Sequence, residues 1–175
     1  MEPHDQLDPA LGLSSGSKVA DLEPIPSSSD IQFPSSSFFQ KHNSTSLPSP
    51  TSIREIARRS PNPRATLRTR PPPVSFPHLG VLVKYGTEVS IAEGQCLLLV
   101  RRTLSPTVPV PEVYGWCKDD GQVFIYMELI DGVTLEKSWE TLIEKDRLAI
   151  CQQLRCMIDA WRSLKCDDTS AFIGK

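Results

Sequence analysis

The stretch that decides the fold runs from Gly80 to Ile130 and opens with Val81-Leu82-Val83-Lys84-Tyr85-Gly86. This run predicts a short apolar strand that closes on a lysine, a residue seldom buried without a partner. A helical segment carrying Glu93 comes next, and the apolar run 123–130 (VFIYMELI) is the clearest strand pattern in the chain. A lysine at the end of a buried strand, ahead of a helix with an inward carboxylate, predicts a site for a phosphate group.

Bulk composition limits the classes of partner. The 175 residues carry a formal net charge of -2, whereas nucleic-acid binding requires a clustered basic face, so we expect no nucleic-acid partner. The sequence contains no run of about 18 apolar residues that could span a membrane, and its acidic start does not read as a signal peptide. The five cysteines form no CxxC pair and are expected to be reduced thiols. These features predict a cytoplasmic protein without a membrane contact.

The first 73 residues are expected to lie outside the folded part. Residues 1–50 are rich in serine and proline and predict a disordered tail, with a phosphorylated docking arm as the alternative. Residues 51–73 predict a basic, proline-rich linker that could carry one short helix, capped by Ser52 with Glu55 three residues on. Its arginines favour a solvated face, the alternative being contact with an anion or an acidic partner. They are Arg54, Arg58, Arg59, Arg64, Arg68 and Arg70.

Residues 74–132 predict a small antiparallel sheet with one helix. Extended structure from Val74 to Val83 is broken at 77–80, where Pro77 confines the first half to an edge or a turn. The helix begins at Ser90, which has capping-box spacing to Glu93. Two further strands form a hairpin through the turn 119–121 (DDG). From the residues alone, Lys84 could instead reach out to solvent, and Glu93 could serve only the cap.

Residues 133–175 predict helices. Thr134 caps a short one, and a long one spans about 144–164, with Thr141 and Glu144 spaced as a capping box. The long helix carries an apolar stripe over 150–164 that needs a covering surface, so we expect an exposed apolar patch and self-association. The order of strands, helix, hairpin and helices predicts the α+β class.

The motifs that usually hold phosphates are absent from the chain. It contains neither a GxxxxGK[ST] loop nor a GxGxxG fingerprint. However, residues from about 70 to 174 resemble the amino-terminal part of the aminoglycoside phosphotransferase-like family, in particular its fungal branch. The matching segments, in chain order, are RPPPVSFPHLGVLVKYG, VSIAEGQCLLLVRRTL, VPVPEVYGW, GQVFIYMELIDGVTLEKSW and FIG.

This resemblance implies a protein-kinase-like fold that binds ATP. Lys84 matches the strand lysine that holds nucleotide phosphates, and Glu93 matches the helix carboxylate that orients this lysine. Met127 would border the adenine, and backbone groups of Glu128 and Ile130 would bond its edge. The segment 74–132 would be the amino-terminal lobe, and 133–175 would begin an incomplete helical lobe.

The resemblance also implies residues that this sequence does not contain. Phosphoryl transfer to a hydroxyl acceptor requires a catalytic-loop aspartate as the base and a further acidic residue for Mg²⁺. In the family both lie downstream of the FIG segment, and the glycine-rich phosphate loop is also missing here. We therefore expect the chain to be inactive alone, with the small-molecule acceptor unidentified. The alternatives are a non-catalytic nucleotide- or protein-binding pseudokinase fragment and a truncated gene model.

Overall fold

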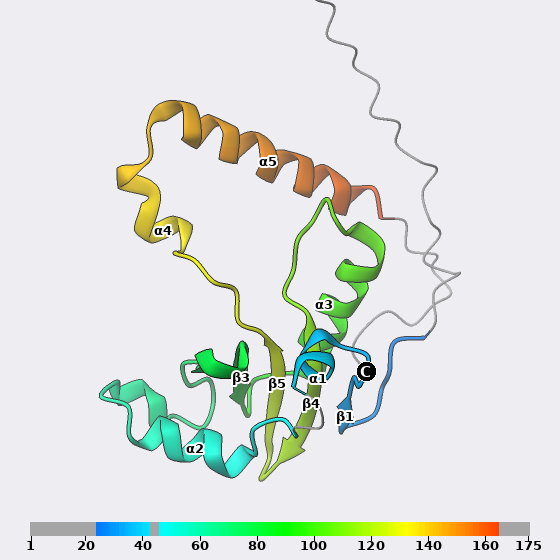
Figure 1. The fold of residues 1–175 in the computed structure, drawn as a ribbon, viewed down its shortest axis with the longest axis vertical. Coiled ribbons are helices and arrows are strands. Elements are labelled where there is room, and N and C mark those ends of the chain that lie inside the picture. The colour runs from blue at the N-terminus through cyan, green and yellow to red at the C-terminus, as the bar shows by residue number, and fades with distance from the viewer. Residues whose placement is uncertain (1–23, 43–45, 165–175) are drawn as a thin grey trace, which may run out of the picture.

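The computed structural model describes residues 24–42 and 46–164, which form a five-stranded antiparallel sheet with helices on both faces (Figure 1). The strand order is β1-β4-β5-β3-β2. The strands are β1 (Ile31–Gln32), β2 (Val74–Phe76), β3 (Val81–Gly86), β4 (Val113–Asp119) and β5 (Gln122–Glu128). The α-helices are α1 (Ser37–Lys41), α2 (Pro50–Arg58), α3 (Ile91–Leu104), α4 (Leu135–Ser138) and α5 (Glu144–Arg162), with short 3-10 turns at Pro63–Thr66, Pro77–Leu79 and Trp139–Thr141. The predicted α+β class is confirmed.

The three central strands owe their apolar sequences to burial on both faces of the sheet. β3 pairs with β5 in a register that places Val83 opposite Tyr126 and Lys84 opposite Ile125. β5 also pairs with β4, and the predicted hairpin turn has positive φ at Asp120 (48°) and Gly121 (72°), as tight hairpin turns require. Every residue from Gln122 to Met127 is buried, so β5 shows a continuous apolar run rather than an alternating one.

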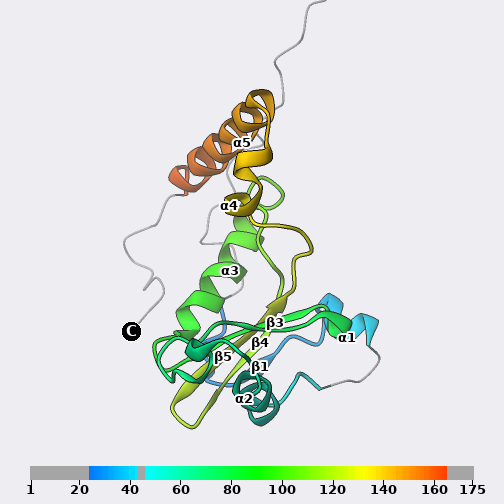
Figure 2. The same ribbon diagram turned by 90° about the vertical axis from the view of Figure 1, so that its left-hand side faces the viewer.

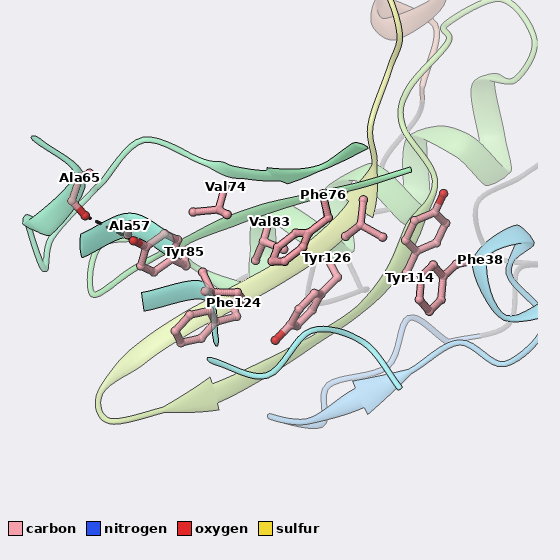
Figure 3. Packing of buried hydrophobic residues seen from close by; sticks show 12 residues of the cluster. Phe38, Ala57, Ala65, Val74, Phe76, Val83, Tyr85, Tyr114, Phe124 and Tyr126 are labelled. Atoms are coloured by element: carbon pink, nitrogen blue, oxygen red, sulfur yellow. Dashed lines mark hydrogen bonds between the residues drawn. The ribbon is translucent and has the colours of Figure 1, made fainter. Parts of the chain in front are cut away.

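The first face of the sheet packs against α2 and the turn that follows it (Figure 3). Tyr85 of β3 stacks on Phe124 of β5, with ring centroids 5.2 Å apart and an interplanar angle of 12°. The Tyr85 hydroxyl donates a hydrogen bond to the Ala65 carbonyl at 3.4 Å. Ile53 and Ala57 bring α2 onto this cluster, and both are buried. The odd-numbered residues of β3 and the even-numbered residues of β5 therefore build one core.

The opposite face carries α3, as Figure 2 shows by placing α2 and α3 on opposite sides of the sheet. Trp116 and Ile125 are buried at the centre of this second core, against which Leu97 and Leu98 of α3 pack. The helix approaches closely because Gly94 has no side chain: a Cβ there would lie 3.0 Å from the Trp116 ring. Lys84 has the same strand parity as Leu82, so its side chain leaves β3 on the α3 side.

The amino-terminal segment corrects the prediction of a disordered tail. Residues 31–32 form β1, which pairs with the outer edge of β4, and α1 follows at 37–41. Phe38 of α1 is only 1% exposed and belongs to the first core. The serine- and proline-rich composition predicts disorder, but a few aromatic residues are enough to anchor this segment to the core. The part of the predicted tail at 1–23 lies outside the described residues.

The short helix that the segment 51–73 could carry is present as α2, but it packs on the sheet through Ile53 and Ala57 and is not part of a free linker. Ser49, not Ser52, caps the helix: its side chain accepts from the Ser52 N–H at 3.2 Å, and Pro50 occupies the first turn. Arg54 lies over the Phe124 ring at 5.0 Å and forms an ion pair with Asp119. The acidic contact of this arginine is thus made within the chain, at the turn of the β4–β5 hairpin.

The carboxy-terminal helices lie farther from the sheet (Figure 1). The predicted cap of α4 is confirmed, since the Thr134 side chain accepts from the Lys137 N–H. The predicted Thr141–Glu144 capping box is wrong: Thr141 donates to the Ser138 carbonyl at 2.7 Å, and α5 begins after Ile143 without a side-chain cap. No helix in the described ranges is long and apolar enough to cross a membrane.

The apolar stripe of α5 is divided between a covered and an uncovered side. Met157 and Leu164 pack against a small cluster at the end of α3, built on Val100, Leu104 and Val108. Three other members of the stripe are exposed: Leu154 (44%), Ile158 (51%) and Trp161 (53%). The expected exposed patch is therefore present on part of the predicted stripe.

Candidate functional site

Lys84 reaches the α3 side of the sheet from the middle of a buried strand. Its neighbours Val83 and Tyr85 are buried in the first core, whereas its own side chain retains 34% of its exposure. An ammonium group so placed keeps one route to solvent and needs an anionic partner on the other side. Glu93, from the first turn of α3, supplies that partner and is exposed to a similar degree (33%).

Glu93 fulfils both roles that its spacing allowed, because its two carboxylate oxygens have different partners. Oε1 accepts the Ser90 N–H at 3.3 Å, which completes the predicted capping box together with the Ser90 hydroxyl at the start of α3. Oε2 forms an ion pair and hydrogen bond with Lys84 Nζ. The cap therefore fixes the carboxylate at the helix start, and the second oxygen holds the lysine.

The surroundings of Glu93 favour its ionised form. Burial alone would raise the pKa of Glu93, but the hydrogen bonds from Lys84 and Ser90 and the charges of Lys84 and Arg70 outweigh it. The net result is a lowered pKa. Arg70 Nη2 lies 4.0 Å from Oε1, so a second cation adjoins this carboxylate. The cluster of Lys84, Arg70 and Glu93 carries two positive charges and one negative charge, an arrangement suited to an incoming anion.

The residues predicted to contact adenine lie at the end of β5 and just after it, and they differ in burial and in hydrogen bonding. Met127 is buried on the α3 side, the same side as Lys84. The Glu128 N–H donates to the Glu112 carbonyl at 2.8 Å, and the Glu128 carboxylate, rather than its carbonyl, accepts the Glu112 N–H at 3.1 Å. This leaves the Glu128 carbonyl outside the β4–β5 ladder. Ile130 is 61% exposed, and its N–H has no hydrogen-bond partner among the described residues.

The structure shows two features that the sequence pattern does not predict, one beside the ion pair and one away from it. The sequence places Arg70 among the arginines of 51–73, and its contact with Glu93 depends on segments that pair in space. A cavity of about 450 Å³ between the loop after α3 and α5 was not predicted at all. Its lining includes Pro106, Gln153 and Met157, but neither Lys84 nor Glu93.

The described ranges hold no group of three or more His, Cys, Asp or Glu side chains that could bind a metal ion. The FIG segment that carries the end of that resemblance lies outside the described residues.

Comparison with known proteins gave no match: no family model fits the chain, and neither a curated protein nor a solved structure is significantly similar to it. The relation to phosphotransferases stays a prediction from the sequence.

Proposed function

We propose that this chain binds ATP on the α3 side of its sheet, through Lys84, Glu93 and the end of β5, as a phosphotransferase-like protein. The observation that carries the proposal is the ion pair between Lys84 and Glu93. The two residues come from different elements, and both side chains keep about one third of their exposure, so the lysine remains partly accessible to solvent. A purely structural surface ion pair contributes little to stability, so burying about two thirds of each side chain for it is poorly explained by packing alone.

The order of elements supports the same proposal. The resemblance implies a certain layout for a kinase-like amino-terminal lobe. It has a lysine on a strand, a glutamate on the following helix, then a hairpin whose last strand leads into helices. The chain has the same order, with the lysine on β3, the glutamate on α3 and the exit from β5 into α4. We propose that residues 74–132 are this lobe and that α4 and α5 begin the helical one. The described structure extends the lobe with β1, α1 and α2, which the resemblance does not include.

Each proposed contact has a physical reason. ATP would supply the transferable phosphoryl group, and Lys84 would attract its phosphates as a point charge. Glu93 holds the ammonium on the α3 side of the sheet through the ion pair. Met127 offers an apolar surface for a base, while the Glu128 carbonyl and the Ile130 N–H offer an acceptor and a donor for its edge.

For the 175-residue chain itself we propose binding without turnover. Transfer to a small-molecule hydroxyl requires a base and acidic metal ligands. The carboxylate that the described residues place beside Lys84 is that of Glu93, which is already held by this lysine and by the Ser90 N–H. A pseudokinase-like nucleotide-binding module is therefore the form of the proposal that we test.

Isothermal titration with ATP tests this proposal on three proteins: the parent chain, Lys84→Met and the control Lys118→Met. Lys118 is an exposed lysine of β4, so its replacement removes the same charge outside the proposed site. We expect Lys84→Met to weaken ATP binding about 10- to 100-fold, the equivalent of one charge-assisted hydrogen bond, and the control to bind like the parent. Absence of ATP binding by the parent would refute nucleotide binding, and equal ATP affinities for the two variants would refute a nucleotide site at Lys84. Release of phosphate by the parent would refute binding without turnover.

A further inference from the structure

The segment just before β2 runs beside the far end of β3, and a glycine makes this possible. The Thr87 N–H donates to the Arg68 carbonyl at 2.9 Å, and the Glu88 N–H donates to the Thr69 carbonyl at 3.0 Å. Gly86 has a φ of 144°, and a Cβ there would lie 2.1 Å from the Thr69 carbonyl oxygen. The backbone before Arg70 is thus held against β3 at a distance that only glycine permits.

This junction places the Arg70 side chain at the edge of the ion pair. Arg70 Nη2 lies 4.0 Å from Glu93 Oε1 and 3.4 Å from the Glu88 carbonyl that it hydrogen-bonds. The side chain remains 60% exposed, and a guanidinium has five N–H donors. Arg70 therefore has donors left for an anion that approaches from solvent, and its planar fork suits a phosphate.

The direction of β3 sets the order in which a bound nucleotide would meet these groups. Val81 pairs with Glu128, at the end proposed for adenine. Lys84 lies three residues farther along the strand, about 10 Å away at the usual rise per residue. Residues 86–88, beside which Arg70 is held, lie beyond Lys84 in the same direction. A nucleotide that begins at the end of β5 and passes Lys84 would present its last phosphate to Arg70.

We infer that Arg70 binds the terminal phosphate of the nucleotide and so makes the site prefer a triphosphate to a diphosphate. This inference rests on the proposed function, because it assumes that the nucleotide lies along β3. Glu93 would then hold two cations that contact successive phosphates of the nucleotide. Lys84 binds one carboxylate oxygen of Glu93, and Arg70 lies near the other. When the phosphates arrive, both cations can turn toward them while the capping hydrogen bond keeps the carboxylate in place.

The test compares the affinities of ATP, ADP and adenosine for the full chain, for Arg70→Gln and for the control Arg58→Gln. Arg58 is an exposed arginine near the end of α2, so its replacement removes the same charge from outside the cluster. We expect Arg70→Gln to bind ATP about ten-fold more weakly, with a much smaller loss for ADP and none for adenosine. A general distortion of the site would instead weaken all three ligands together.

The outcomes separate this inference from the proposed function. Parent-like ATP affinity in Arg70→Gln, together with loss of binding in Lys84→Met, would overturn the role of Arg70 and leave the nucleotide site standing. Equal losses for ATP and adenosine in Arg70→Gln would overturn it as well. Failure of the parent to bind any of the three ligands would overturn both proposals. Partial recovery of the ATP preference in Arg70→Lys would support a contact made through charge.

Discussion

Replacing Phe38 by alanine tests whether the amino-terminal segment is part of the folded unit. The ring is 1% exposed, lies 5.4 Å from the Tyr114 ring and meets the Phe39 ring edge-on at 5.0 Å. A segment that is merely draped over the surface would not bury an aromatic side chain to this extent. We therefore expect Phe38→Ala to lower the free energy of unfolding substantially.

The magnitude follows from the buried area. An aromatic side chain buries roughly 150–250 Å², which at about 25 cal/mol per Å² corresponds to about 4–6 kcal/mol. Measured losses for Phe→Ala in protein cores are about 3–5 kcal/mol. Local release of the segment would limit the loss to the free energy of docking it, so the drop is expected to lie between about 2 and 5 kcal/mol.

Urea denaturation followed by far-ultraviolet circular dichroism measures this loss, with Phe39→Ala as the matched control. Phe39 carries the same ring one residue along and only packs against the border of the core, so its replacement should cost less. Hydrogen exchange adds a local measurement, because Phe33 donates its N–H to the Tyr114 carbonyl and this amide should lose protection when the segment is released. A change within about 0.5 kcal/mol of the parent, as for an ordinary surface substitution, would refute the packing of this segment.

Three further outcomes are expected. Because the pKa of Glu93 is lowered in the fold, its ion pair stabilises the protein fully above the ordinary value of 4.5, and this contribution is lost as the pH falls through the lowered pKa. The stability difference between the parent and Glu93→Gln, measured by urea denaturation, should therefore shrink in acid. Gly86→Ala should lower the free energy of unfolding by at least about 2 kcal/mol, since a Cβ would strike the backbone, whereas Gly80→Ala, with open space around it, should cost about 1 kcal/mol in thermal or urea unfolding. Sedimentation velocity should show concentration-dependent association of the parent, weakened when Leu154 and Ile158 are both replaced by glutamine.

For each of these three expectations, one specific result would contradict it. A stability difference for Glu93→Gln that stays constant into acid would contradict the ion pair. Equal costs for Gly86→Ala and Gly80→Ala would contradict the close approach of the segment before β2. A monomer at all concentrations would contradict association through α5.

The central part of the fold could be predicted because its signals are local. The strand that begins at Val81, the turn at 119–121 and the capping box of Ser90 and Glu93 all depend on residues within a few positions of one another. The strand was predicted to close on Lys84, whereas β3 continues to Gly86, so this lysine lies within it. The ion pair of the candidate site followed from the same pattern, since a lysine on a buried strand needs a partner and α3 offers Glu93. Its use for ATP remains a proposal.

The features that the sequence predicts wrongly depend on contacts between distant segments or on local signals that compete with one another. β1 has two residues and pairs with β4 more than 80 positions away, so no short-range period marks it. The start of α2 was misplaced because Ser52 and Glu55 fit a capping box, whereas Pro50 fixes the first turn and Ser49 becomes the cap. The sequence pattern does not distinguish Arg70 from the other arginines of 51–73, because its position depends on the pairing of 68–69 with 87–88.

The pairing of β1 with β4 has a consequence for how the protein tolerates shortening. Without residues 31–32, β4 would present open N–H and C=O groups beside the buried Trp116, whose indole N–H donates to the Ser28 carbonyl. An exposed edge strand of this kind can pair with strands of neighbouring molecules. A chain trimmed to begin at residue 74, the first residue of the predicted sheet segment, would thus be expected to precipitate, whereas one that keeps residues 24–73 would keep this edge covered.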